Sequence, residues 1–185
     1  VVGLPLLPGE EPPSDGAGGE GFDTVGDSLF TSTIHLETYL RVADRLIEAA
    51  LPDAAPEDSL RTEVRDRILI VTPTSLDSAS EIPDLDAAQL ILKEFARRAW
   101  RRPVTDSEVA RLMLLYESTS QRGTTFLNAI REPLKAILVS PHFLFVVETD
   151  PEESGVQRLT PHQLATRLAL FIWSSLPDDE LLTKA

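Results

Sequence analysis

The stretch that decides the fold runs from Asp86 to Arg102 and reads DAAQLILKEFARRAWRR. Its apolar residues recur every three or four positions with charges between them, which is the spacing of an amphipathic helix. The expected apolar face consists of Ala87, Leu90, Ile91, Phe95, Ala99 and, at its edge, Trp100. Pro103 follows at once, and a proline cannot continue a helix. The sequence therefore predicts a helix over residues 86–102 that buries one face in a core.

Downstream of this helix, capping signals mark further helix starts. Thr105 and Glu108 form a Thr-x-x-Glu capping box, in which each side chain satisfies a free main-chain N–H. The pattern returns as Thr160–Pro161–His162–Gln163, with proline at the first helical position. We expect a helix from Thr105 to before Gly123, and another from Thr124 or Thr125 to about Val139. Pro133 lies inside the second of these helices and should kink it. Three further helices are expected: one from Ser140–Pro141 through a short apolar segment, one from Thr160 to about Trp173, and one from Pro177 onward.

The upstream half is less regular. Seven of the nine glycines lie in the first 26 residues, and through Asp27 the chain holds six acids and no base. Such a composition buries too little apolar surface to offset its ordering entropy, so we predict an extended, loop-like segment over residues 1–29. Helical periodicity predicts a helix over residues 33–51. The following stretch is expected to be a linker over 52–85, with a short helix over 60–67, a brief extended segment over 68–72 and a loop over 74–83.

Together these elements predict an all-α protein, an irregular helical bundle with an extended Gly/Pro-rich N-terminal segment. The composition then limits its function. The chain has 30 acidic and 17 basic residues, a net charge of −13, and an acidic surface repels phosphate backbones, so nucleic acid is not an expected partner. It has no cysteine, which rules out disulfides, thiolate metal sites and covalent haem attachment within this chain. No apolar run approaches the ~18–20 residues of a membrane span.

The most conspicuous candidate site is the cluster Ala96–Arg102, in which four arginines flank Trp100. Arginines beside an aromatic ring are able to bind phosphate or stack a base. However, these arginines lie in the last turn of a helix, where cations favour the negative end of the dipole, and acids are abundant enough to pair with each of them. We therefore interpret the cluster as a salt-bridged helix end.

The remaining candidates point to no chemistry of their own. His35, His142 and His162 lack the i, i+3 or i, i+4 partner of a helical metal site, so we interpret them as surface or capping residues. The acidic stretch 10–27 lacks the acids that a calcium loop needs at its third and fifth positions. Hydrolase and phosphate-loop signatures are absent, and Met113 has the spacing of a core residue. The residues alone therefore assign no catalytic, cofactor-binding or metal-binding role.

Five stretches of the sequence nevertheless resemble the motifs of one known family of multi-module proteins. GFDTVGDSL at 21–29, with LETYL at 36–40, looks like the end of the first module. FARRAWRRPVT at 95–105 and ILVSPHFLF at 137–145 resemble the signature and the closing motif of the second. Leu159 with QLATRLALFIWSSLPDDELL at 163–182 is similar to the opening of the third. The family that these motifs resemble is that of the planctomycete-type multi-domain c-type cytochrome-associated proteins, which have tandem helical domains of unknown function.

The resemblance implies a division of the chain and a departure from the family. Residues 1–51 would be the C-terminal part of a first helical module, 52–85 a linker, 86–150 the second module and 151–185 the start of the third, so the chain would be a piece of a longer protein. Many relatives carry cysteines near the positions of Val71 and Ala87, and that staple is absent here. No Cys-x-x-Cys-His occurs, so any haem c would be held outside this chain.

The resemblance further implies an exported protein, periplasmic, secreted or attached to the cell envelope. Its partners would be the other domains of its own full-length protein and an electron-transfer partner. The first hypothesis is a non-catalytic helical scaffold or interaction module. The alternative is part of a haem-coupled extracellular enzyme, an oxidoreductase or hydrolase acting on an envelope or polysaccharide substrate, to which Arg97, Arg98, Trp100 and His142 would contribute. A weaker option is a carbohydrate-binding surface using Trp100 and Trp173, although core packing is the expected role of both tryptophans.

Overall fold

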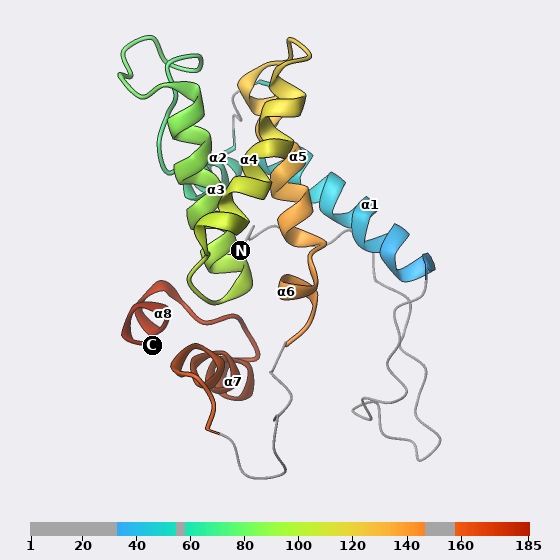
Figure 1. Cartoon of the computed structure of the whole chain (residues 1–185), viewed down its shortest axis with the longest axis vertical. Helices are drawn as coiled ribbons and strands as arrows, with labels where there is room; N and C mark the ends of the chain where they lie inside the picture. Colours follow the sequence, from blue (N-terminus) through green and yellow to red (C-terminus); the bar gives the residue numbers. More distant parts are fainter. Residues whose placement is uncertain (1–32, 55–57, 147–157) are drawn as a thin grey trace.

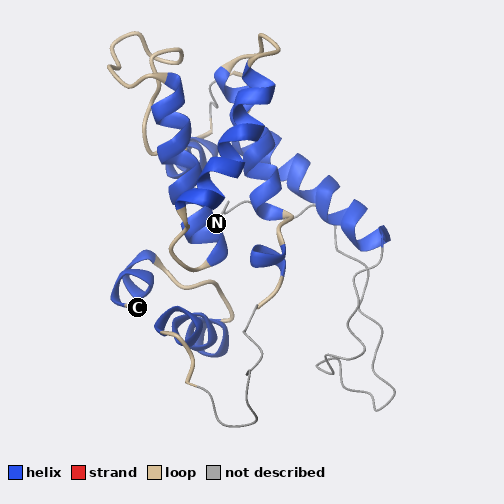
Figure 2. Ribbon diagram, in the orientation of Figure 1, coloured by secondary structure: helices blue, strands red, loops and turns tan. Residues whose placement is uncertain are grey.

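The computed structural model describes residues 33–54, 58–146 and 158–185. Within these ranges the chain forms helices and no strand, so the all-α prediction is confirmed (Figure 2). The helices are α1 (Thr33–Ala50), α2 (Ser59–Ile68), α3 (Asp84–Trp100), α4 (Asp106–Ser120), α5 (Phe126–Leu138), α6 (Pro141–Leu144), α7 (Pro161–Trp173) and α8 (Asp179–Lys184). The Gly/Pro-rich segment 1–29 lies outside the described residues.

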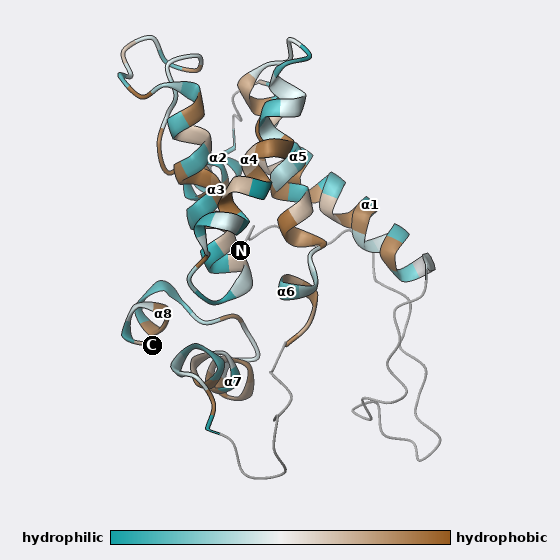
Figure 3. Ribbon diagram, viewed as in Figure 1, coloured by the Kyte–Doolittle hydropathy of each residue, from teal (hydrophilic) through white to brown (hydrophobic). Residues whose placement is uncertain are grey.

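The core lies where α5 packs against α4, α3 and α1, with α2 beside α1 (Figure 1). Its largest fully buried side chains are aliphatic, in line with the low aromatic content: Ile47, Leu51, Val64, Ile91, Leu92, Ile130, Leu134 and Ile137. Polar and apolar residues alternate along α1, so that only one side of this helix faces the core (Figure 3). Burying each such side chain contributes about 1.5–3 kcal/mol, which makes this cluster the main source of stability.

The predicted helix starts are confirmed at their caps. Both halves of the capping box are present at Thr105 and Glu108, and again at Thr160 and Gln163. Of the two threonines considered for α5, Thr125 is the N-cap, and its hydroxyl accepts a hydrogen bond from the main-chain N–H of Asn128. These caps bind main-chain groups that helix formation leaves without partners, and this is why sequence alone locates them well.

In the region between α1 and α3, the predicted short helix is present but the predicted extended segment is not. The short helix predicted over 60–67 forms as α2, whose Val64 and Ile68 are buried in the core. The extended segment predicted over 68–72 is wrong, because Ile68 completes α2 and the residues that follow form bends and turns rather than a strand. Pro73, a few residues further on, is fully buried. β-branched residues need a neighbouring strand to pair with, and the described part of the chain offers none.

Several apolar residues expected in the core lie at the surface instead. Leu90 on α3 is exposed, as is Trp173 on α7, whereas Ala88, Leu92 and Ala96 of α3 are buried. Eight α3 residues from Ala87 to Trp100 face the bundle, and Leu90 lies beyond the edge of that face. Helical spacing predicted an apolar face correctly, but it did not fix where the covered part of that face ends.

The helices α7 and α8 lie together at one end of the bundle, near the C-terminal end of α3 (Figure 1). Their buried residues Ala165, Ala169 and Leu182 are not part of the core cluster formed by α1–α5. No helix among the described residues has both the length and the apolarity that crossing a membrane requires.

Candidate functional site

The arginine cluster predicted from sequence lies at the end of the bundle that faces α7 and α8. Arg97 and Arg98 both contact Glu94 on their own helix and Asp179 at the start of α8. Arg97 Nη2 lies 2.8 Å from Glu94 Oε1 and 2.5 Å from Asp179 Oδ1. Arg98 Nε lies 3.0 Å from Glu94 Oε1, and its Nη2 lies 3.2 Å from Asp179 Oδ2. Two cations and two anions thus form one network that joins α3 to α8.

The charges in this network shift one another's proton affinities. The hydrogen bond to Glu94 is the largest influence on Arg97, and together with Asp179 it outweighs partial desolvation and raises the arginine's pKa. Desolvation alone would raise the pKa of Asp179, but the hydrogen bond from Arg97 and the positive charges of Arg98 and Arg97 outweigh it and lower that pKa. Both shifts favour the charged forms of Arg97 and Asp179, so this pair is ionised near neutral pH.

Arg102 forms a second pairing, in which it links the α3–α4 turn to the capping box. Its guanidinium donates to both carboxylate oxygens of Glu108, with Nη2 2.7 Å from Oε1 and Nη1 3.1 Å from Oε2. The hydrogen bond from Arg102, assisted by those from Thr105, outweighs desolvation and lowers the pKa of Glu108 to about 2. The same guanidinium lies over the Trp100 ring, its central carbon 5.5 Å from the ring centroid.

Arg101 differs from its three neighbours because its partners are main-chain carbonyl groups. It ends α3 in the left-handed conformation, with φ of 58°, and the residue is only 7% exposed. Its guanidinium donates to the carbonyl oxygens of Ala99, His142, Phe143 and Phe145. Three of these carbonyls lie in or directly after the short helix α6, where a cation satisfies acceptors that the helix leaves free. Arg101 therefore fastens α6 to the end of α3.

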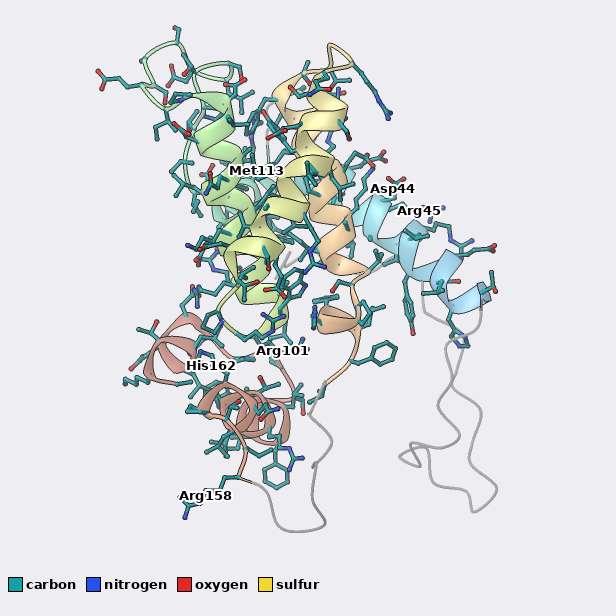
Figure 4. The ribbon with its side chains drawn as sticks, in the orientation of Figure 1. Asp44, Arg45, Arg101, Met113, Arg158 and His162 are labelled. Atoms are coloured by element: carbon teal, nitrogen blue, oxygen red, sulfur yellow. The ribbon has the colours of Figure 1, made fainter. Side chains whose placement is uncertain are left out.

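A pocket of about 240 Å³ lies beside Arg101, between the α3–α6 end of the bundle and the start of α7. It is lined by Trp100, Arg101, Arg102, His142, Val146, Thr160, His162, Gln163 and Thr166. Figure 4 shows Arg101 at the end of α3 and His162 on α7, the two sides that the pocket separates. The pocket brings together a buried guanidinium, two imidazoles and a wall of tryptophan and valine.

The two histidines take different places in this pocket. The His142 ring lies 5.3 Å from the Trp100 ring, centroid to centroid, and its Nε2 is 3.9 Å from Glu108 Oε1. His162 occupies the first turn of α7, as the capping box predicted. Their convergence is not readable from the sequence, because they are 20 positions apart and lie at the starts of two different helices. Across the described ranges no three metal-ligating side chains gather into a site.

The remaining candidates have the following outcomes. The salt-bridged interpretation is confirmed for Arg97, Arg98 and Arg102. It is wrong for Arg101, which donates to main-chain carbonyl oxygens instead. Trp100 is 8% exposed, and its indole N–H donates to the carbonyl oxygen of Ile137 at 3.3 Å, as expected for a core residue. The core expectation is wrong for Trp173, which is the last residue of α7 and is 53% exposed. The acidic stretch 10–27 lies outside the described residues.

Fold and site together define an all-α protein whose arginine-rich helix end joins successive helical units. Comparison with known families agrees: the family model PSD3, a protein of unknown function (DUF1587), matches residues 1–52, PSD5 (DUF1595) matches 87–148 and PSD4 (DUF1592) matches 159–185. These three adjacent domains are the tandem domains of unknown function typical of planctomycete cytochrome c-associated proteins. No curated protein and no solved structure matches the chain.

Proposed function

We propose that this chain is a non-catalytic helical scaffold and interaction module of an exported, cytochrome c-linked multi-domain protein. The observation that carries the proposal is the exposed apolar surface of α7. Its large apolar residues at the surface are Leu164, Leu168, Leu170, Phe171, Ile172 and Trp173. Phe171 is 89% exposed, and it shares one helix face with Leu164 and Leu168 at i, i+4 and i+7 spacing. An exposed apolar face of this kind marks a site of protein contact.

The arginine cluster supports the same role. Arg97, Arg98 and Arg102 are neutralised by carboxylates of this chain, and Arg101 binds main-chain carbonyls. Groups committed to such contacts hold helices together, and they leave the catalytic interpretation without the unpaired arginines that it needs. The partner that we propose for α7 is a further domain of the same polypeptide, consistent with the match of PSD4 to residues 159–185.

Fluorescence quenching of Trp173 tests this role. In a Trp100→Phe background, acrylamide should quench Trp173 strongly in the 185-residue chain and weakly in the full-length protein, because a docked domain would cover it. The reciprocal Trp173→Phe variant is the control, since Trp100 is buried already and its quenching should not change. Equal quenching of Trp173 in both proteins would contradict the proposal.

The cytochrome link and the export have their own test. The full-length reading frame should encode a signal peptide and a Cys-x-x-Cys-His segment outside these 185 residues, and the purified full-length protein should show the absorption spectrum of haem c. A cytosolic reading frame without that segment would contradict this part of the proposal. The scaffold role would then still be tested separately by the quenching of Trp173 fluorescence.

One observation favours the alternative, part of a haem-coupled extracellular oxidoreductase or hydrolase: His142 and His162 line the same pocket. Two imidazoles are able to act as general acid and base if a substrate lies between them. In that case the single variants His142→Ala and His162→Ala would each abolish turnover of an envelope polysaccharide by the full-length protein. The scaffold role instead requires that both variants behave like the parent in such an assay.

A further inference from the structure

The positive charge of Arg101 is not matched by a carboxylate. Each of the other three arginines in the cluster lies within 3.2 Å of an acidic oxygen. For Arg101 no ion pair is formed with any described residue, and its four hydrogen bonds all go to main-chain carbonyl oxygens. Carbonyl dipoles satisfy the N–H groups of a guanidinium, but they leave its unit of net charge uncompensated.

Burial makes this uncompensated charge costly. Desolvation lowers the pKa of Arg101, which is the mark of a cation that its surroundings do not neutralise. An arginine nevertheless keeps its proton at neutral pH, so the residue remains a fixed positive charge. An anion that enters the adjoining pocket would therefore be attracted to this charge.

The other walls of the pocket fit a small organic group. Gln163 accepts a hydrogen bond from the N–H of Thr160 through Oε1 at 2.8 Å, which leaves its amide NH₂ as a donor. His142 and His162 contribute imidazole nitrogens, while Trp100 and Val146 supply an apolar wall. The nearby carboxylate of Glu108 repels an anion only weakly, because Arg102 binds both of its oxygens.

We propose that this pocket is a binding site for a small organic carboxylate. A single uncompensated cation matches a monoanion, whereas a phosphate dianion would need a second charge that Arg102 cannot offer while it is paired with Glu108. The space of about 240 Å³ is large enough for a carboxylate that carries a short or ring-shaped uncharged part. This assignment does not depend on the scaffold role or on the cytochrome link.

The test uses Trp100 as the reporter, in a Trp173→Phe background so that it is the only tryptophan. Sodium acetate, sodium propionate and sodium glucuronate are titrated at constant ionic strength, with glucose and inorganic phosphate as comparison probes. We expect saturable fluorescence changes with the carboxylates, none with glucose, and weaker binding of phosphate. Absence of saturation with all three carboxylates, or tighter binding of phosphate, would overturn the assignment.

Matched variants then locate the site. Arg101→Gln should weaken carboxylate binding by about tenfold or more, since it removes the charge, while Arg61→Gln removes the same charge from an exposed position on α2 and should change nothing. Should Arg101→Gln lose its helical circular dichroism, His162→Val supplies the second measurement and should weaken binding several-fold. Unchanged affinity in a folded Arg101→Gln protein, or in His162→Val, would refute the site.

Discussion

Arg97 on α3 and Asp179 in the first turn of α8 are 82 residues apart in sequence, and Arg97 Nη2 lies 2.5 Å from Asp179 Oδ1. This contact belongs to a network that holds the α7–α8 pair against the bundle, where the core cluster of α1–α5 does not extend. Ion pairs therefore contribute to the attachment of α8 to α3. Its strength should depend on salt and on the charge of one aspartate.

The first prediction concerns that aspartate. Asp179→Asn should increase amide hydrogen exchange in α8 and lower the free energy of unfolding by about 0.5–1 kcal/mol, a modest amount because the side chain is half exposed. In the parent protein about 0.5 M NaCl should produce part of the same change, since salt screens exposed charges. The control is Glu180→Gln, which removes an acid whose ion pair among the described residues is with the exposed Lys184, and it should change α8 less.

The second prediction is a pH dependence set by Glu108. Because its pKa in the folded protein is lowered to about 2, the pairing with Arg102 stabilises the fold fully above the ordinary glutamate pKa and loses that effect as the pH falls toward 2. Glu108→Gln should lower the free energy of unfolding at pH 7 by about 1–3 kcal/mol. Urea titrations from neutral pH to pH 3 should show the two proteins converging; a constant difference would contradict the assignment.

The third prediction concerns Arg131. Its guanidinium binds a main-chain carbonyl oxygen just after α1, as Arg101 binds the carbonyl oxygens of α6. Its Nε donates to the carbonyl oxygen of Leu51 at 3.0 Å, and its Nη2 lies 2.8 Å from Asp53 Oδ1. Arg131→Met should cost about 2–4 kcal/mol, because it leaves the end of α1 without a donor. Arg111→Met, at an exposed position on α4, is the matched control and should change the thermal unfolding midpoint little.

The fourth prediction separates surface from core. Phe171→Ser should leave the free energy of unfolding within about 0.5 kcal/mol of the parent and reduce binding of an apolar dye, because the ring is already in solvent. Ile130→Ala, at a fully buried position on α5, should cost about 2–5 kcal/mol. A large loss of stability in Phe171→Ser would contradict the exposed position of the Phe171 ring.

The sequence was informative where the physics is local. Thr105 with Glu108, and Thr160 with Gln163, bind main-chain groups within the same helical turn, so their spacing alone located two helix starts. Periodicity likewise identified the helices. It failed for Leu90 and Trp173, because apolar spacing says which residues share a face but not which neighbour covers them.

The candidate site depended on tertiary structure. The arginine-rich stretch was recognisable, and pairing with acids was predicted for all four of its arginines; it is confirmed for three of them and wrong for Arg101. Nothing local indicated that Arg101 would bind carbonyls more than 40 positions away, or that His142 and His162 would share a pocket. Both outcomes follow from the way α6 and α7 lie against the end of α3, which no spacing rule specifies.

The long-range contacts of Arg131 and Arg97 also indicate the order in which the chain folds. The helices α3, α4 and α5 are consecutive and pack on one another, so they meet after closing only short loops. Arg131 reaches Leu51 across 80 positions and Arg97 reaches Asp179 across 82, and each of these closures restricts a far longer stretch of chain. We therefore expect α3, α4 and α5 to form the folding nucleus, and α1 and α8 to dock onto it afterwards.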